Sequence, residues 1–244
     1  MNESLKFFDD EANRMLRFLS HPLYRYQKIK RYKHALEMLR LKRSDNVIEI
    51  GCGVGYQIPE IANRCKSYVG IDFSKEAIKF CKKIKNVKLK IADAYKIPFK
   101  NNSFDVVIMI DVFHNLKNSK KVLNEAKRVL KKNGKIVISV ANWYSFYGLT
   151  RIIFEKILKW KYKFLSPINN WYTFSSVISL MKSEGFSIKE IRSSFFLPHF
   201  FTGKSYLIPP LEIIPRIYDN FETFLSKYFK YFGYHIILCC LKNN

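Results

Sequence analysis

Acidic residues are scarce in this sequence of 244 residues, in which 20 Asp and Glu accompany 43 Lys and Arg and leave a formal net charge of +23. The basic excess is spread along the whole chain. Two interpretations therefore stay open: a general compositional bias, or a surface that binds nucleic acid or an anionic membrane. Charge alone does not identify a partner.

Long apolar runs are also missing. The stretch from Ile236 to Leu241 is far shorter than the ~20 residues that span a bilayer, and the N-terminal residues contain early acids and no long apolar core. The five cysteines show no CxxC spacing, which disfavours a zinc or dithiol site. We expect a cytoplasmic protein without a transmembrane segment or a metal site.

What the sequence does contain is enough apolar residues, 48% of the chain, for a substantial core in a single domain over residues 1–244. Residues 1–45 have helical spacing interrupted by Pro22. From residue 46 onward short apolar runs alternate with amphipathic stretches. The predicted strands are 47–50, 68–71, 87–92, 104–110 and 135–140, and the predicted helices are 57–65, 74–84 and 118–131. This alternation predicts an α/β fold with a mostly parallel sheet and helices on both faces.

The C-terminal part is expected to add a helix begun by Thr173 or Ser175 and ended by Gly185, a following strand, and a last strand over 234–242. Asn133-Gly134 is expected to end the preceding helix as a left-handed cap.

Two aromatic segments, 142–170 and 197–233, interrupt the core 46–141 and its C-terminal extension. We predict that they cap the substrate. Residues 149–164 are basic and amphipathic, which is also typical of peripheral membrane contact.

A glycine-rich turn, Gly51-Cys52-Gly53-Val54-Gly55, follows the first predicted strand. Tyr56 stands where the dinucleotide fingerprint needs a glycine, which disfavours a dinucleotide. The turn suits S-adenosylmethionine, which has no phosphate and needs close backbone approach to its methionine and ribose portions. Glu49, at the end of the strand, is placed to meet the cofactor's cationic amine directly or through water.

Acids follow the next two predicted strands. Asp72 can accept both ribose hydroxyls, and Phe73 beside it can stack on adenine. Asp93 can accept the adenine amino group, while the backbone amide of Ala94 is available to a ring nitrogen. Each aspartate also has a simpler interpretation, an N-cap for Asp72 and a turn for Asp93. Together with the glycine turn, the set favours adenosylmethionine.

Four runs carry a resemblance to a known family: VIEIGCGVGYQIPEIA, VGIDFSKEAIKFCKK, IADAYKIPFKNNSFDVVIMIDVFHNL and AKRVLKKNGKIVIS. Over residues 44–142 the sequence resembles the class I S-adenosylmethionine-dependent methyltransferases, in particular the group that modifies small molecules, quinones and some tRNAs. The resemblance implies a Rossmann-like, seven-stranded sheet whose last strand is antiparallel. It also implies a cofactor site formed by Gly51, Gly53, Gly55, Asp72, Asp93 and Ala94.

Residues 109–116 lie where that family presents side chains to the methyl group and the substrate. The resemblance assigns Met109 to the cofactor and makes His114 and Asp111 candidate catalytic residues. His114 can act as a general base near neutral pH, or it can simply shape the pocket at a helix start. A base is optional, because methyl transfer is an in-line displacement that depends mainly on alignment. This segment has no Asn/Asp-Pro-Pro-Tyr motif, which argues against methylation of an exocyclic base amine by the route that uses it.

Three interpretations of the acceptor remain. The leading one is a small, apolar or lipid-like molecule held under the aromatic segments. The second is tRNA, bound by the basic segment 14–43. The third is a non-catalytic member of the fold that serves as a binding module.

Overall fold

The computed structural model describes residues 2–19, 22–81, 84–145, 170–194 and 231–243, together with the single residues and pairs 148, 149, 152, 153, 222, 224, 225, 228 and 229. The two aromatic segments predicted to cap the substrate, and the amphipathic stretch 149–164, lie for the most part outside the described residues.

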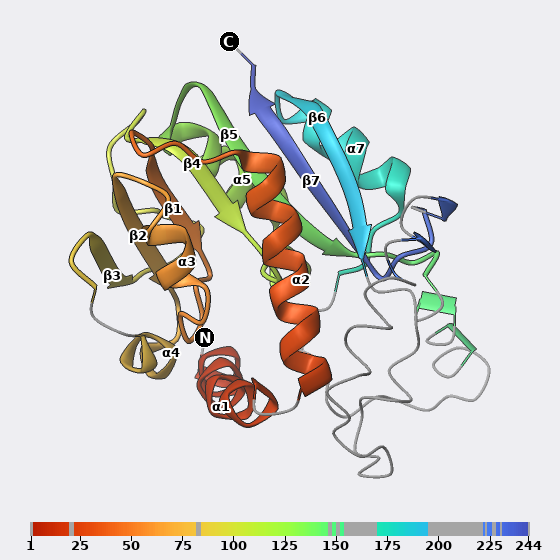
Figure 1. Ribbon diagram of the computed structural model, residues 1–244, viewed down its shortest axis with the longest axis horizontal. Helices are drawn as coiled ribbons and strands as arrows, with labels where there is room; N and C mark the ends of the chain where they lie inside the picture. The colour runs from red at the N-terminus through yellow and green to blue at the C-terminus, as the bar shows by residue number, and fades with distance from the viewer. Residues whose placement is uncertain are drawn as a thin grey trace.

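Seven strands form one sheet in the order β3-β2-β1-β4-β5-β7-β6 (Figure 1). Their bounds are Asn46–Ile50 for β1, Ser67–Asp72 for β2, Val87–Ile91 for β3, Phe104–Met109 for β4, Leu130–Ala141 for β5, Phe186–Ser194 for β6 and His235–Lys242 for β7. Strands β1 to β5 pair in parallel, whereas β7 runs antiparallel to both β5 and β6. The predicted mostly parallel sheet with an antiparallel last strand is confirmed.

The order of the strands reverses between β1 and β4. The chain adds β2 and β3 on one side of β1 and then returns to pair β4 with the other side. Connections that leave two neighbouring strands in opposite directions leave a crevice outside their carboxyl ends, and this is where open α/β sheets bind ligands. The fold therefore places a crevice after Ile50 and Met109.

Helices cover both faces of the sheet (Figure 1). They are α1 Asn2–Leu19, α2 Pro22–Leu39, α3 Ile58–Ala62, α4 Lys75–Phe80, α5 Ser119–Val129, α7 Phe174–Ser183 and the short 3-10 helix η1 Phe113–Asn115. Val47 packs in a cluster with α2 and α3, and its neighbour Ile48 packs in a second cluster with α5 and α7. This alternation is the period of two that a strand buried on both faces must have.

Several predicted element ends are confirmed. Helix α2 begins at Pro22, Thr173 forms a capping box with Ser176 at the start of α7, and Gly185 follows α7 with φ +81°. The helical spacing predicted for residues 1–45 is confirmed by α1 and α2.

The predicted cap at Asn133-Gly134 is wrong. Helix α5 already ends at Val129, and Leu130 is the first residue of β5. Asn133 does have the left-handed φ of +59°, but it lies inside the strand, where the pairing of β4 with β5 shifts. Asn133 therefore lies at an irregularity of the strand pairing, where some bulges place a residue in the same left-handed conformation that a helix cap uses.

Within the described residues, no helix combines the length and apolar character needed to cross a membrane.

Candidate active site

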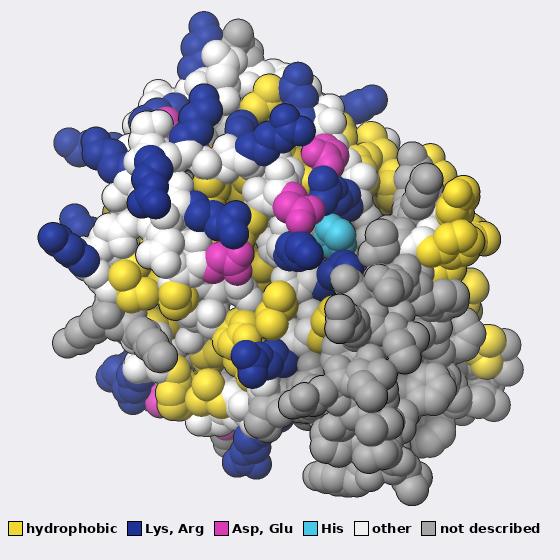
Figure 2. Space-filling model, in the orientation of Figure 1, with side chains coloured by type: hydrophobic (Ala, Val, Ile, Leu, Met, Phe, Trp, Pro, Cys, Tyr) yellow, Lys and Arg dark blue, Asp and Glu magenta, His cyan; other side chains and the backbone are white. Residues whose placement is uncertain are grey.

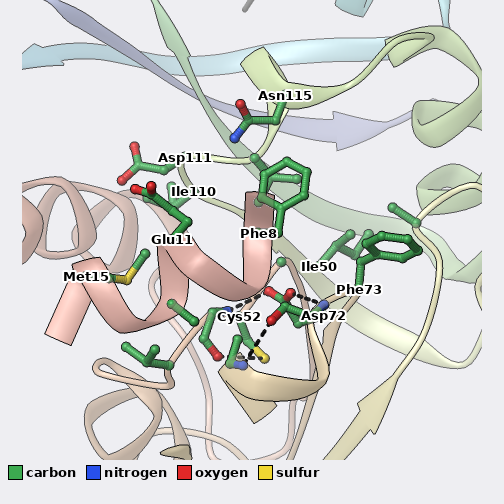
Figure 3. Close-up of a pocket in the computed structure, with 18 of the residues that line it drawn as sticks. Phe8, Glu11, Met15, Ile50, Cys52, Asp72, Phe73, Ile110, Asp111 and Asn115 are labelled. Carbon is green, nitrogen blue, oxygen red and sulfur yellow. Dashed lines mark hydrogen bonds between the residues drawn. The ribbon is translucent and has the colours of Figure 1, made fainter. Parts of the chain in front are cut away.

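A cavity of about 540 Å³ lies at the carboxyl ends of the parallel strands. One part of its wall comes from the loops after β1, β2 and β3, and another comes from α2, the loop after β4 and the start of β7. Helix α1 closes over it with Phe8, Glu11, Ala12, Met15 and Leu19, which recur at helical spacing (Figure 3). The cavity therefore lies where the order of the strands reverses, between β1 and β4.

The glycine turn after β1 requires its glycines. Gly51, Gly53 and Gly55 all have φ between +53° and +76°, a region that L side chains rarely adopt. A Cβ on Gly51 would lie 2.2 Å from Val112 Cγ2, and one on Gly55 would lie 2.7 Å from Cys81 Sγ. The turn thus presses against the loop after β4 on one side and against the end of α4 on the other.

Gly53 is different, because a Cβ there would meet only Met15 of α1, at 3.8 Å. Its backbone face is therefore open to the cavity. Its amide donates to Asp72 Oδ2 at 2.8 Å, and the amide of Ser74 donates to Asp72 Oδ1 at 2.9 Å (Figure 3). Each carboxylate oxygen keeps a further lone pair, so Asp72 can still accept hydroxyl donors from the cavity.

Asp72 is not the N-cap of α4. Ser74 holds that position, since its side chain accepts from the amide of Ala77 at 3.0 Å. Burial raises the pKa of Asp72 above its ordinary value, while hydrogen bonds from backbone amides oppose the rise. The capping alternative is therefore wrong, and the carboxylate is left facing the cavity.

Phe73, Asp93 and Ala94 also line the cavity, as expected. Asp93 is exposed, and its Oδ1 accepts from the amide of Tyr95 at 2.9 Å. The turn predicted for this aspartate is present, and it leaves the other carboxylate oxygen available. The structure thus brings the glycine turn, Asp72 and Asp93 to one wall.

Two expected cofactor residues, Glu49 and Met109, do not line the cavity. Successive strand residues point to opposite faces. The Glu49 side chain lies on the face covered by α2, where it accepts from Tyr32 Oη of α2 at 2.6 Å and from Tyr68 Oη of β2 at 2.5 Å. Burial raises the pKa of Glu49 to about 7, against the effect of these two hydrogen bonds. Met109 is fully buried in the core cluster that contains α5.

Asp111 follows β4 and lies in a cluster of charges. Its Oδ2 accepts from Arg31 Nη2 at 2.7 Å and from Lys28 Nζ at 2.8 Å, both on α2. Burial raises the pKa of Asp111, but the combined effect of the nearby basic groups, led by Arg31 and Lys28 and including His235, holds this pKa well below its usual range. Its φ of +61° is uncommon for any residue except glycine. A carboxylate so paired is a weak proton acceptor.

His114, in η1, lines the cavity beside Asp111. Burial is the main cause that lowers the pKa of His114 to about 4, while Asp111 opposes the shift and Lys28 adds to it. Its Nδ1 is buried and has no hydrogen-bond partner among the described residues. The imidazole is consequently neutral at neutral pH and can accept a proton or a hydrogen bond, although it is a weak base.

Sequence reasoning missed a set of cavity residues that come from other elements: Phe8, Glu11, Ala12, Met15, Leu19, Lys28, Arg31, Tyr32, Tyr234 and His235. The spacing of the α1 residues is a helical face and was visible in the sequence. The positions on α2 and β7 had no comparable signal, because only the folded sheet brings them to β4.

The residues present fit adenosylmethionine. The glycines form a cradle that added Cβ atoms would fill or obstruct, and carboxylates suited to hydroxyl and amino donors stand at the ends of β2 and β3. In the part of the chain that the structure describes, no group of three or more His, Cys, Asp or Glu side chains is arranged to hold a metal.

Comparison with known proteins agrees with this fit. A family model described as a methyltransferase domain matches residues 48–138. An uncharacterised protein of Methanocaldococcus jannaschii is 31% identical over 214 residues, which cover 84% of this chain and 84% of that protein. A demethylmenaquinone methyltransferase of Thermotoga maritima is 27% identical over 222 residues, which cover 83% and 90%. For another M. jannaschii protein, 35% identical over 137 residues, the match spans only 51% of its length.

Solved structures share the fold over nearly the whole chain. A chain in the complex of a Haloferax volcanii methyltransferase with the activator Trm112 superposes with a TM-score of 0.70 at 16% identity, covering 97% of this chain and 98% of that one. A Thermotoga maritima methyltransferase gives a TM-score of 0.67 at 18% identity, covering 98% and 100%. The protein belongs to the class I S-adenosylmethionine-dependent methyltransferases, whose methyl donor is S-adenosylmethionine.

Proposed function

We propose that this protein transfers the methyl group of S-adenosylmethionine to a small acceptor with an apolar or lipid-like body. The observation that carries the proposal is the single cavity that joins the glycine turn, Asp72 and Asp93 to the Asp111–His114 wall under the roof of α1. Donor and acceptor can lie in this cavity together, as in-line displacement requires.

The chain's residues have distinct proposed roles. Asp72 holds the ribose hydroxyls, Phe73 packs against adenine, and Asp93 with the amide of Ala94 holds the adenine edge. The glycine turn lets the methionine portion approach the backbone. Bound there, S-adenosylmethionine would supply an electrophilic methyl carbon on a sulfonium that is a good leaving group. Helix α1 keeps water away from the reacting atoms.

His114 is the proposed acceptor of a hydrogen bond or a proton from the methyl acceptor. Its lowered pKa makes it a weak base, so its main contribution is orientation, and an acceptor that loses a proton does so largely through its own acidity. Asp111 is a positioning residue, because its carboxylate is held by Arg31 and Lys28.

An apolar acceptor body is supported by the roof of the cavity. Ala12 of α1 packs with Val54 and Ala77 in a small apolar cluster, and Met15 and Leu19 pack against it. Phe8 adds an aromatic ring to the wall (Figure 3). The T. maritima relative, whose name assigns it demethylmenaquinone, points in the same direction.

The surface gives less support to tRNA. Figure 2 shows Lys and Arg side chains scattered over the visible face, with acidic side chains among them, and not gathered into one stripe. Nucleic-acid sites are usually marked by a concentrated basic patch. We therefore retain tRNA as an outcome of the test.

Calorimetry with adenosylmethionine and labelled-methyl transfer test the proposal. We expect saturable binding that weakens at least ~10-fold in Asp72→Ala, since hydrogen bonds to a charged group are lost. Asp10→Ala, an exposed aspartate on α1 that does not line the cavity, is the matched control and should bind normally.

The same labelled donor is then offered with a lipid and metabolite extract or with tRNA. Label in a small molecule supports the proposal. Label in tRNA, together with tRNA binding that weakens steeply as salt rises, would contradict the proposal and support tRNA as the methyl acceptor. No binding of adenosylmethionine at all would refute both.

A further inference from the structure

A second feature of the cavity has no role in holding the adenosine part of the donor. Lys28 and Arg31, one turn apart on α2, both line the cavity beside Asp111. Both cations donate to the same atom, Asp111 Oδ2, at 2.8 Å and 2.7 Å. The other carboxylate oxygen, Oδ1, lies 3.4 Å from Ser139 Oγ. One carboxylate oxygen is therefore shared by two cationic side chains that carry further N–H donors.

Arg31 has a buried N–H donor that lacks a hydrogen-bond partner among the described residues. Its side chain is 6% exposed, and its guanidinium reaches Asp111 through Nη2. Its Nε is buried and has no hydrogen-bond partner among the described residues. A buried guanidinium with unmet donors is costly unless a ligand satisfies them. This unmet capacity lies in the wall of a ligand cavity.

Among the described residues, the other charged groups at this wall do not supply the missing partner of Arg31 Nε. Glu11 of α1 lies near Lys28; burial raises its pKa, and Arg14 and Lys28 oppose that rise. His114 is neutral at neutral pH and adds no charge. Lys28 thus interacts with Glu11 as well as with Asp111, whereas Arg31 has Asp111 as its acceptor among the described residues.

The cluster lies close to the glycine turn that is proposed to hold the methyl donor. Gly51 of the cofactor turn abuts Val112, the residue after Asp111, so closely that a Cβ on Gly51 would lie 2.2 Å from Val112 Cγ2. A ligand group at Arg31 is consequently a neighbour of the methionine end of the donor and of the acceptor. The planar fork of arginine matches a carboxylate with two parallel hydrogen bonds.

We propose that Arg31, assisted by Lys28, forms a subsite for a carboxylate-like oxyanion in the cavity. The inference rests on the proposed function, and it allows two sources of the same chemistry: the α-carboxylate of adenosylmethionine, or an acidic group of the acceptor, such as a carboxylate or a phenolate. Asp111 then positions the two cations for the ligand.

The test compares Arg31→Gln and Lys28→Gln with Lys33→Gln, an exposed lysine of α2 that does not line the cavity. Calorimetry measures the affinity of each protein for adenosylmethionine and for decarboxylated adenosylmethionine. A second titration adds benzoate, or benzamide as its neutral counterpart, to protein saturated with S-adenosylhomocysteine. Arg31→Lys keeps the charge without the fork and provides a folded alternative if Arg31→Gln unfolds.

If the donor's carboxylate is the ligand, Arg31→Gln should weaken adenosylmethionine at least ~10-fold and leave the decarboxylated analogue unaffected. If the acceptor is the source, adenosylmethionine should bind normally, and benzoate, but not benzamide, should lose at least ~10-fold in affinity. In both cases Lys33→Gln should behave as the unaltered protein, and Arg31→Lys should fall between.

Two results would overturn the oxyanion subsite alone. In the first, the Arg31 and Lys28 variants bind every one of these ligands with the same affinity as the unaltered protein. In the second, the affinity for adenosylmethionine does not depend on Arg31, and the unaltered protein does not bind benzoate. If the unaltered protein binds neither form of adenosylmethionine, the proposed function itself fails. The two failures are therefore distinct.

Discussion

The part of the cavity proposed to hold the donor, called here the donor half, and the part proposed to hold the acceptor, the acceptor half, are built in different ways. The donor half consists of the loops after β1, β2 and β3, and it depends on backbone geometry and a few carboxylates. The acceptor half is assembled from α2, the loop after β4 and the start of β7, and it depends on buried charges. The comparison shows that one half is encoded by local sequence and the other by tertiary packing.

The largest effect is expected in the acceptor half. Asp111→Asn removes the carboxylate that pairs with Arg31 and Lys28, whose side chains are 6% and 13% exposed. Removing one partner of a buried ion pair leaves an uncompensated charge, so the free energy of unfolding should fall by about 3 kcal/mol. Chemical denaturation measures it.

Glu60→Gln provides the matched control, because its pair with Arg64 is about half exposed. We expect a change of about 0.5 kcal/mol or less. If Asp111→Asn lowers the free energy of unfolding no more than this control does, the stability of the acceptor half does not depend on its buried charges.

The donor half is probed by glycine substitutions. Gly51→Ala combines a φ of +76° with a contact of 2.2 Å to Val112, so we expect a loss of about 2 kcal/mol in stability together with loss of cofactor binding. Adding Val112→Ala should restore part of the stability by removing the contact but not the strain.

Gly53→Ala has the same handedness requirement but open space around its Cβ. It should weaken adenosylmethionine binding with a smaller loss of stability than Gly51→Ala, as calorimetry and thermal unfolding together will show. Equal stability losses in the two variants would contradict the description of Gly53 as an open face.

A smaller effect concerns pH. The pKa of His114 falls to about 4 in the folded protein, so between pH ~6.5 and ~4 the unfolded chain binds a proton that the folded protein does not. Unfolding free energy should therefore decrease as pH falls through this window, by up to about 1.4 kcal/mol per pH unit for this one group. His114→Gln should remove that part of the slope.

His34 is the matched control, because burial is the main cause that lowers its pKa to about 4 as well, and it does not line the cavity. His34→Gln should remove a similar slope and leave methyl transfer intact. An unchanged slope in His114→Gln would mean that its imidazole is not held neutral by Lys28, Arg31 and burial.

The smallest effect is expected at Asp93. This aspartate is exposed, so a hydrogen bond to the ligand there competes with water. Asp93→Ala should weaken adenosylmethionine about 2- to 10-fold, less than Asp72→Ala. The reverse order in calorimetry would contradict the assignment of the buried and exposed carboxylates.

The sheet and most of the donor half could be predicted from the sequence. The alternation of strands and helices predicted the parallel core. Gly51, Gly53 and Gly55 marked a turn with positive φ angles, which residues other than glycine rarely adopt. Asp72 and Asp93 were predictable because the carboxyl ends of neighbouring parallel strands meet at one edge.

Other features could not be predicted. Glu49 turns toward α2 because of the strand's alternation, so its place in the sequence beside the glycine turn did not reveal its tyrosine partners. Arg31 and Lys28 look like any basic pair on a helix until the fold brings them to Asp111. A left-handed asparagine, Asn133, is compatible with both a cap and a bulge, and only the strand pairing decides between them.

A crystal structure with S-adenosylhomocysteine tests the central claim most directly. We expect the ribose hydroxyls within hydrogen-bond distance of Asp72, adenine between Phe73 and Asp93, and the methionine portion over Gly53. A ligand bound elsewhere, or in this cavity with adenine at Arg31 and away from Asp93, would contradict it.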